Sequence, residues 1–175
     1  MYIKYGFRDY RGGGRSSGRE TIGRVAAGAV ASKLLKELGI SVCAYTSAIG
    51  PVTINPNNFN KEEIQKNPLY MPDAQAAEKA QNYLEQCMKE CNSSGGMVEC
   101  IISGVPAGIG EPAFEKLDAA LAKAIFSIGA VKGFEIGDGM NVADSTGLQN
   151  NDGYYVDEKG CRQKYSNHSG GITGG

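Results

Sequence analysis

The chain has 175 residues, of which 41% are hydrophobic and 21% are charged, and it contains 25 glycines and no tryptophan. These values are ordinary for a globular protein, and the length leaves room for one domain rather than two. A net charge of −1 gives no support for binding to nucleic acid or to an anionic membrane, and no apolar run is long enough to span a bilayer.

The first half of the chain predicts a helix and strand pattern. Residues 2–8 alternate loosely and indicate a strand end, and residues 9–18 form a loop of glycine and serine. Apolar residues at three-to-four spacing predict a helix from Glu20 to Leu38, which Gly39 ends. Small residues at 26–29 indicate that this helix packs tightly. Residues 40–49 predict a half-buried strand, closed by a Gly-Pro turn.

The second half continues the pattern. By composition residues 51–72 are the least ordered stretch, with a short helical piece at 61–66. A helix is predicted from Asp73 to Cys91, a buried strand at 97–105, and a helix at 113–128 with its apolar face inward. A short strand at 131–136 and a possible hairpin at 154–159 follow. This order predicts a mixed α/β fold of the α+β type, with helices packed on a sheet in one domain over residues 1–175.

Five scattered cysteines contain no CxxC pair, which is typical of reduced, buried thiols in a cytoplasmic protein. Cys87 and Cys91 lie one helical turn apart and could share a metal. However, the chain has one histidine and no second cysteine pair, so core packing is the better interpretation, and no metal site is predicted.

The densest chemistry lies in residues 9–20, DYRGGGRSSGRE, which we call the arginine–glycine loop. The first 24 residues carry six basic side chains against two acidic ones, which indicates a discrete anion site. Arg11, Arg15 and Arg19 offer planar forks that bind phosphate or carboxylate at two points. The glycines expose backbone N–H groups, and a helix N-terminus follows. The alternative is a solvated turn with a capping serine and surface arginines.

The run YGFRDYRGGGRSSGRETIGRVAAGAVA resembles the signature of the chorismate synthase family. Two further stretches are similar to family segments in the same order. They are VECIISGVPAGIGEPAFEKLDAALAKAIFSIGAVKGFEIGDG and NHSGGITGG. Together the three stretches cover most of the chain apart from about residues 50–75.

The resemblance implies a carbon–oxygen lyase of the shikimate pathway, which leads to the aromatic amino acids. The family eliminates phosphate from 5-enolpyruvylshikimate 3-phosphate in the 1,4-anti sense to give chorismate. It requires reduced FMN, with NADPH as a possible reductant. The resemblance also implies a sandwich of helices between antiparallel sheets, incomplete in this chain, and a homotetramer in the cytoplasm.

The resemblance also assigns site residues. The RSS element of the family contacts the flavin, which implies this role for Arg15, Ser16 and Ser17. The arginine of the following element contacts the substrate, which implies this role for Arg19. The NxxGG segment contacts the flavin again, which points to His168 and Ser169.

His168 is the one histidine of the chain, and its role stays open. It could contact the flavin, serve as a plain loop residue, or donate a proton near neutral pH. The two acid–base histidines of the family have no counterpart here, so no catalytic residue is assigned. The sequence is therefore expected to be an internal fragment that lacks the N-terminal and C-terminal segments of the family.

Three interpretations follow. The first is an incomplete chorismate synthase. The second is a catalytically dead fragment that keeps only flavin or phosphate binding. The third is a structural role, in which the arginine–glycine loop merely caps a helix.

Overall fold

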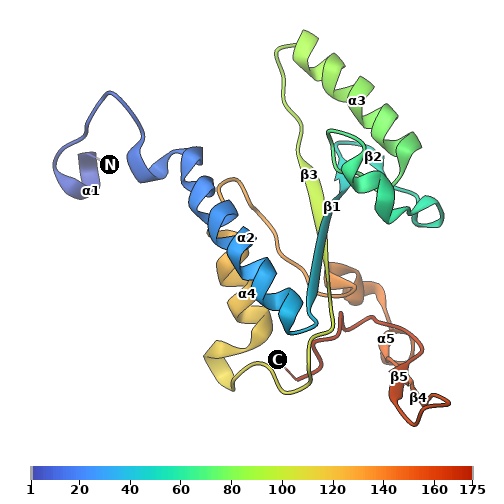
Figure 1. Ribbon diagram of the computed structural model, residues 1–175. Helices are drawn as coiled ribbons and strands as arrows, with labels where there is room; N and C mark the ends of the chain where they lie inside the picture. Colours follow the sequence, from blue (N-terminus) through green and yellow to red (C-terminus); the bar gives the residue numbers. More distant parts are fainter. Residues whose placement is uncertain (1, 175) are drawn as a thin grey trace. The chain divides into compact units, whose positions relative to one another are not determined.

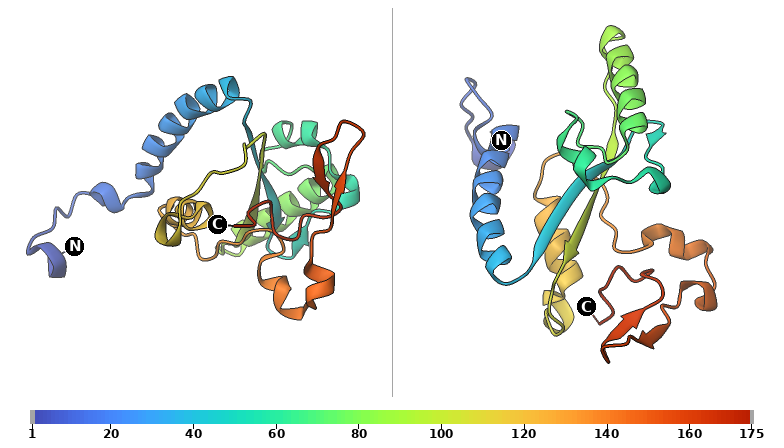
Figure 2. Two further views of the ribbon diagram at one scale, coloured as in Figure 1. Left: turned by 90° about the horizontal axis from the view of Figure 1, so that it is seen from below. Right: turned by 45° about the vertical axis from the view of Figure 1, so that its right-hand side comes forward.

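A computed structural model describes residues 2–174 (Figure 1, Figure 2). The chain divides into two compact units. One unit comprises the chain up to Ala26 together with the chain from Pro106 onward, and the other comprises Ala27–Val105. The helix α2, Thr21–Glu37, begins in the first unit and ends in the second.

The second unit is built on a three-stranded antiparallel sheet with the order β2-β1-β3. The strands are β1 (Ser41–Ile49), β2 (Val52–Thr53) and β3 (Gly96–Ser103). β1 and β3 pair from Ser41 opposite Ser103 to Ile49 opposite Gly96, with a register shift between Thr46 and Ala48. The long two-stranded ribbon that results is visible in Figure 1.

The core of this unit lies where α3 (Ala74–Lys89) packs against the segment that precedes it. The cluster consists of Met71, Ala76, Ala77 and Ala80, and Met71 and Ala80 are fully buried. Two short 3-10 helices, η3 (Pro56–Asn58) and η4 (Lys61–Gln65), lead into it.

Asp73 fixes the start of α3. It is 3% exposed, and its Oδ1 accepts hydrogen bonds from the N–H groups of Gln75 at 3.0 Å and Ala76 at 3.2 Å. Its Oδ2 accepts from the N–H group of Asn55 at 3.0 Å. One carboxylate therefore caps the helix and ties it to the chain that follows β2.

The first unit contains mostly short elements. They are α1 (Tyr2–Tyr5), η1 (Gly14–Ser16), η2 (Gly18–Glu20), η5 (Ala113–Glu115), α4 (Leu117–Phe126), η6 (Gly139–Asp144), α5 (Gly147–Asn150), and a hairpin of β4 (Tyr154–Val156) and β5 (Arg162–Lys164). Arg24, at the start of α2, donates to the carbonyl oxygen of Ser127 at 2.8 Å and to its hydroxyl at 3.0 Å. This side chain ties α2 to the C-terminal end of α4.

The predicted mixed fold with antiparallel sheets is confirmed, as are the helices at 21–37 and 74–89 and the strands at 41–49 and 96–103. The hairpin predicted at 154–159 begins at Tyr154 but extends to Lys164. Two predicted strands are wrong. Residues 2–5 form a turn of helix, because the N–H group of Gly6 bonds the carbonyl oxygen of Tyr2 at 2.8 Å and Gly6 has φ +76°. Residues 131–136 form no strand, since no described segment pairs with them.

The predicted burial is wrong in several places. No residue of α2 or α4 is buried, and every residue of β3 is exposed. Apolar periodicity locates the helix but does not supply the neighbour that covers its apolar face. The cysteines are free as predicted, yet Cys87 alone is buried. Conversely, the stretch at 51–72, predicted as the least ordered, contains Ile64 and Met71, which are 2% and 0% exposed.

Candidate functional site

The arginine–glycine loop is shaped by its own glycines. Gly13 has right-handed helical angles (φ −82°, ψ −11°), and Gly14 follows with φ +54°. A right-handed residue followed by a left-handed one turns successive backbone N–H groups toward one side, where they form a concave site for an anion. Gly14 requires glycine for this conformation. The loop therefore offers backbone donors as well as arginines to a negative group.

Two serine hydroxyls brace the same loop. The hydroxyl of Ser16 donates to the carbonyl oxygen of Gly13, and the hydroxyl of Ser17 accepts from the N–H group of Arg19 at 3.4 Å. Ser17 thereby caps η2, which leads directly into α2. Ser16 stays exposed, while Ser17 is half-buried. The hydroxyls thus hold the loop in shape, and each keeps further capacity for hydrogen bonds with a ligand.

The arginines of the loop differ in what they contact. Nε and Nη2 of Arg11 lie 2.9 Å from the two carboxylate oxygens of Asp9, so this arginine is already paired. The side-chain hydrogen bond from Arg11 is the largest of the effects that hold the pKa of Asp9 below its ordinary value. Among the described residues, no carboxylate lies within ion-pair distance of Arg15 or Arg19, and both are exposed. The guanidinium groups of Arg15 and Arg19 are therefore exposed without a described carboxylate partner, unlike that of Arg11.

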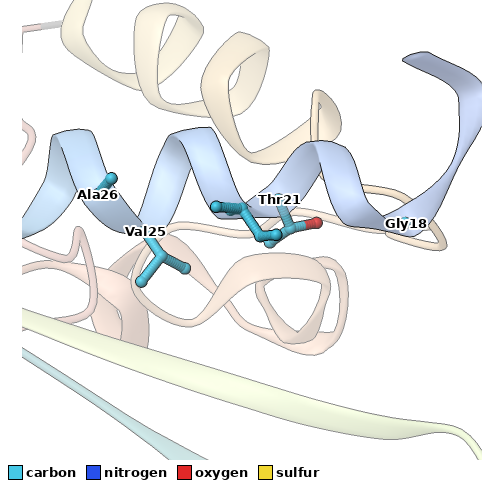
Figure 3. A pocket seen from close by; sticks show the side chains of 5 residues that line it. Gly18, Thr21, Val25 and Ala26 are labelled. Carbon is cyan, nitrogen blue, oxygen red and sulfur yellow. The ribbon is translucent and has the colours of Figure 1, made fainter. Parts of the chain in front are cut away.

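An apolar hollow lies on α2 directly after the loop (Figure 3). It has a volume of about 440 Å³ and is lined by Gly18, Thr21, Ile22, Val25 and Ala26. Figure 3 shows the side chains of Thr21 and Val25 along one face of this helix. The exposed polar groups of the arginine–glycine loop are therefore followed directly by an apolar surface on α2.

The second group of expected site residues lies in residues 164–171, which we call the His168 segment. Its organising residue is Asp152, whose carboxylate is 6% exposed. This carboxylate accepts five hydrogen bonds. The donors are the hydroxyls of Ser166 and Ser169, each at 2.7 Å, the N–H groups of His168 at 2.8 Å and Ser169 at 3.1 Å, and the ammonium of Lys164 at 3.3 Å. The hydroxyls of Ser166 and Ser169 contribute most to a pKa of Asp152 far below its ordinary value.

A second carboxylate faces the same segment. Nδ1 of His168 lies 2.6 Å from Oδ2 of Asp138, and the carbonyl oxygen of His168 accepts from the N–H group of Asp138 at 2.9 Å. Gly137 lies so close that a Cβ built on it would clash with the carbonyl oxygen of His168. Residues 137–139 and the His168 segment are therefore in direct contact.

The structure groups the expected site residues in two places. Arg15, Ser16, Ser17 and Arg19 lie in the arginine–glycine loop, and His168 and Ser169 lie in the His168 segment. Between residues 2 and 174, no hydrogen bond or ion pair joins the two places. Asp138 and Asp152 were not among the expected site residues. Each is flanked by glycine or asparagine in a turn-rich stretch, and Asp138 also lies near the end of a family-like stretch, but neither signal reveals a partner 17 or 30 residues away.

The described residues show neither a metal cluster nor a membrane-spanning helix. No group of three or more histidine, cysteine or acidic side chains is arranged to hold a metal ion there. No helix in that part of the chain has the length and apolar character needed to cross a membrane.

The fold and the loop together define a protein of mixed helices and antiparallel sheets with a site suited to an anionic ligand. The family model described as chorismate synthase matches residues 1–175. The chain is 67% identical over 172 residues to the chorismate synthase of Lachnoclostridium phytofermentans and 64% identical to that of Agathobacter rectalis, covering 98% of this chain and 47% of each relative. A crystal structure of chorismate synthase matches it with a TM-score of 0.89 and 32% identity, over 99% of this chain and 57% of the other.

The chain belongs to the chorismate synthase family. It spans about half the length of the relatives it matches.

Proposed function

We propose that this chain forms the flavin-binding and substrate-binding part of a chorismate synthase. The reaction is the 1,4-anti elimination of phosphate from 5-enolpyruvylshikimate 3-phosphate, with reduced FMN as cofactor. The observation that carries the proposal is the arginine–glycine loop, in which Arg15 and Arg19 are exposed and have no described carboxylate partner. Family membership supports the reaction class.

The donors present fit FMN and a phosphorylated substrate. Arg15, Ser16 and Ser17 would hold the flavin, because the loop combines a guanidinium, two hydroxyls and converging N–H groups. When bound, the reduced flavin supplies transient electron density to the substrate ring. His168 and Ser169 would contact the flavin from the second place in the structure.

Arg19 would bind the substrate and stabilise the departing phosphate. Negative charge develops on that group as its bond to carbon breaks, and a fixed guanidinium lowers the energy of this charge. The hydrogen bond between the N–H group of Arg19 and the hydroxyl of Ser17 fixes the backbone from which the guanidinium extends.

The test uses a chimera in which this chain replaces the matching residues of the Lachnoclostridium phytofermentans relative. With reduced FMN and 5-enolpyruvylshikimate 3-phosphate under anaerobic conditions, the chimera should form chorismate. Arg15→Ala should weaken FMN binding by about 10-fold to 100-fold, the cost of a lost charged hydrogen bond. Arg19→Ala should raise KM and lower kcat while FMN binding is kept. Arg162→Ala is the charge control, because Arg162 is an exposed arginine of β5. It should leave FMN binding, KM and kcat unchanged.

Failure of the unmodified chimera to form chorismate would reject the proposal. Equal FMN and substrate affinities for the chimera and both loop variants would instead support a structural role for the loop. In that case the arginine–glycine loop would only cap α2.

The second candidate function is binding without turnover by this chain alone. It is favoured by one observation: the chain has a single histidine, and Nδ1 of that residue faces Asp138. FMN quenching with no chorismate from the chain alone, set against turnover by the chimera, would support this candidate.

We also propose a cytoplasmic homotetramer, with NADPH as a possible reductant of the flavin, because the family resemblance implies both. Light scattering of the chimera tests the tetramer, and oxidation of NADPH in the presence of FMN tests the reductant.

A further inference from the structure

The His168 segment is anchored by a carboxylate that the proposed reaction does not use. Asp152 lies before the β4–β5 hairpin, and its partners Ser166, His168 and Ser169 lie after it. Oδ1 accepts from Ser166 and from the N–H group of His168, and Oδ2 accepts from both donors of Ser169. Each oxygen therefore fixes a different part of the segment.

His168 itself is held at three points. Its N–H group donates to Asp152, its carbonyl oxygen accepts from the N–H group of Asp138, and its Nδ1 lies 2.6 Å from the carboxylate of Asp138. An ionised carboxylate only accepts hydrogen bonds, so Nδ1 must carry the hydrogen. Nε2 is then the ring nitrogen left for another group. The imidazole is 34% exposed, so a ligand can reach it.

We propose that Asp152 and Asp138 are positioning residues for the flavin site. Asp152 fixes the backbone of His168 and Ser169, and Asp138 sets the direction of the imidazole so that Nε2 is presented to the flavin. This inference rests on the proposed function, because it assumes that His168 and Ser169 contact the flavin.

The chemistry around Asp152 explains why the residue is a carboxylate. Four of its five hydrogen bonds come from neutral donors, and the fifth comes from the ammonium of Lys164. Lys164 also donates to the hydroxyl of Ser169 at 2.8 Å. An amide in the same place could accept at its oxygen only, and its NH₂ group would face the donors of Ser169. Asp152→Asn should therefore release the part of the segment around Ser169.

Asp157 provides a matched control, because its carboxylate also accepts several hydrogen bonds but does not contact the His168 segment. Its carboxylate accepts from the N–H groups of Cys161 at 2.8 Å and Lys159 at 3.0 Å, and from the side chain of Gln163 at 3.1 Å. These bonds close the β4–β5 turn. If Asp152 only stabilised the hairpin, Asp152→Asn and Asp157→Asn should have equal effects on FMN binding.

The experiment measures FMN binding to the chimera by fluorescence quenching, together with the visible difference spectrum of the bound flavin. Asp152→Asn should raise Kd about tenfold and change the spectrum, while Asp157→Asn should change neither. Asp138→Ala should raise Kd about threefold and alter the spectrum. Asp138→Asn should keep the Kd and the spectrum of the unmodified chimera, because an amide oxygen still accepts from Nδ1–H of His168.

Unchanged Kd and unchanged spectra for Asp152→Asn and Asp138→Ala, in a chimera that binds FMN, would overturn this inference and leave the proposed function intact. A chimera that binds no FMN would overturn both. If Asp152→Asn fails to fold, Ser166→Ala decides, since it removes a single 2.7 Å hydrogen bond to Asp152. A Kd raised about threefold for Ser166→Ala supports the inference, and an unchanged Kd overturns it.

Discussion

Removing the side chain of Asp73 should loosen α3 from its N-terminal end. Two effects add in Asp73→Ala. The helix loses its cap, which costs about 1 kcal/mol, and the N–H group of Asn55 loses its acceptor, which costs about 1 kcal/mol more at a partly buried position. The sum of about 2 kcal/mol corresponds to roughly thirtyfold faster exchange of amides that open with the helix.

Hydrogen exchange of the α3 amides, followed by mass spectrometry, measures this effect directly. Asn60→Ala is the matched control, because Asn60 caps η4 through one exposed bond to the N–H group of Glu62 at 3.0 Å. It should change the exchange of α3 by less than about threefold. Equal exchange in Asp73→Ala and the unmodified chain would refute the reasoning, since it would mean that the buried carboxylate contributes nothing to the helix.

Three further predictions concern the core, the close contact at the site, and acid. Met71→Ala should destabilise the second unit by about 3 kcal/mol in urea unfolding, because Met71 is fully buried, whereas Met88→Ala, at a side chain 74% exposed, should stay within about 0.5 kcal/mol. Gly137→Ala should weaken FMN binding to the chimera, because its Cβ would clash with the His168 segment at φ +59°. A Cβ on Gly147, which lies in neither proposed site, meets nothing within 4 Å, so an equal weakening by Gly147→Ala would contradict this account. The pKa of Asp152 is lowered, so the stability that its carboxylate contributes is present above the ordinary pKa of 3.8 and is lost as the pH falls below that value. A carboxyl ¹³C titration of Asp152 with a midpoint at or above 3.8 would disprove this.

Features with a local cause could be predicted from the sequence. The helix predicted at Glu20–Leu38 is found at Thr21–Glu37, and the helix predicted from Asp73 begins at Ala74, with Asp73 as its cap. Apolar spacing, a terminating glycine and a capping carboxylate act within one or two turns of chain. The arginine–glycine loop belongs to the same class, since its glycine angles and its serine bonds lie within a few residues.

Features that depend on a distant partner could not be predicted. The short stretch at 131–136 is predicted as a strand, yet a strand forms only where another segment completes its ladder. The tight packing predicted for α2 was wrong for a related reason. The position of the helix was predicted well, but Ile22, Val25 and Val30 remain 68–72% exposed. The spacing of apolar residues indicates which face of a helix favours burial, but only contact with another segment buries that face.

The two places that hold the expected site residues are therefore stabilised by different means. The arginine–glycine loop derives its shape from its own residues, so distant substitutions should leave its donors in place. The His168 segment derives its shape from carboxylates 16 and 30 residues before His168 in the chain. Substitutions at 137–139 or at Asp152 should then disturb flavin contact, although no contact with the flavin itself is assigned to these residues. Under the proposed function, Asp138 and Asp152 would determine how His168 and Ser169 are presented to the flavin, whereas the arginine–glycine loop would need no distant carboxylate to keep its shape.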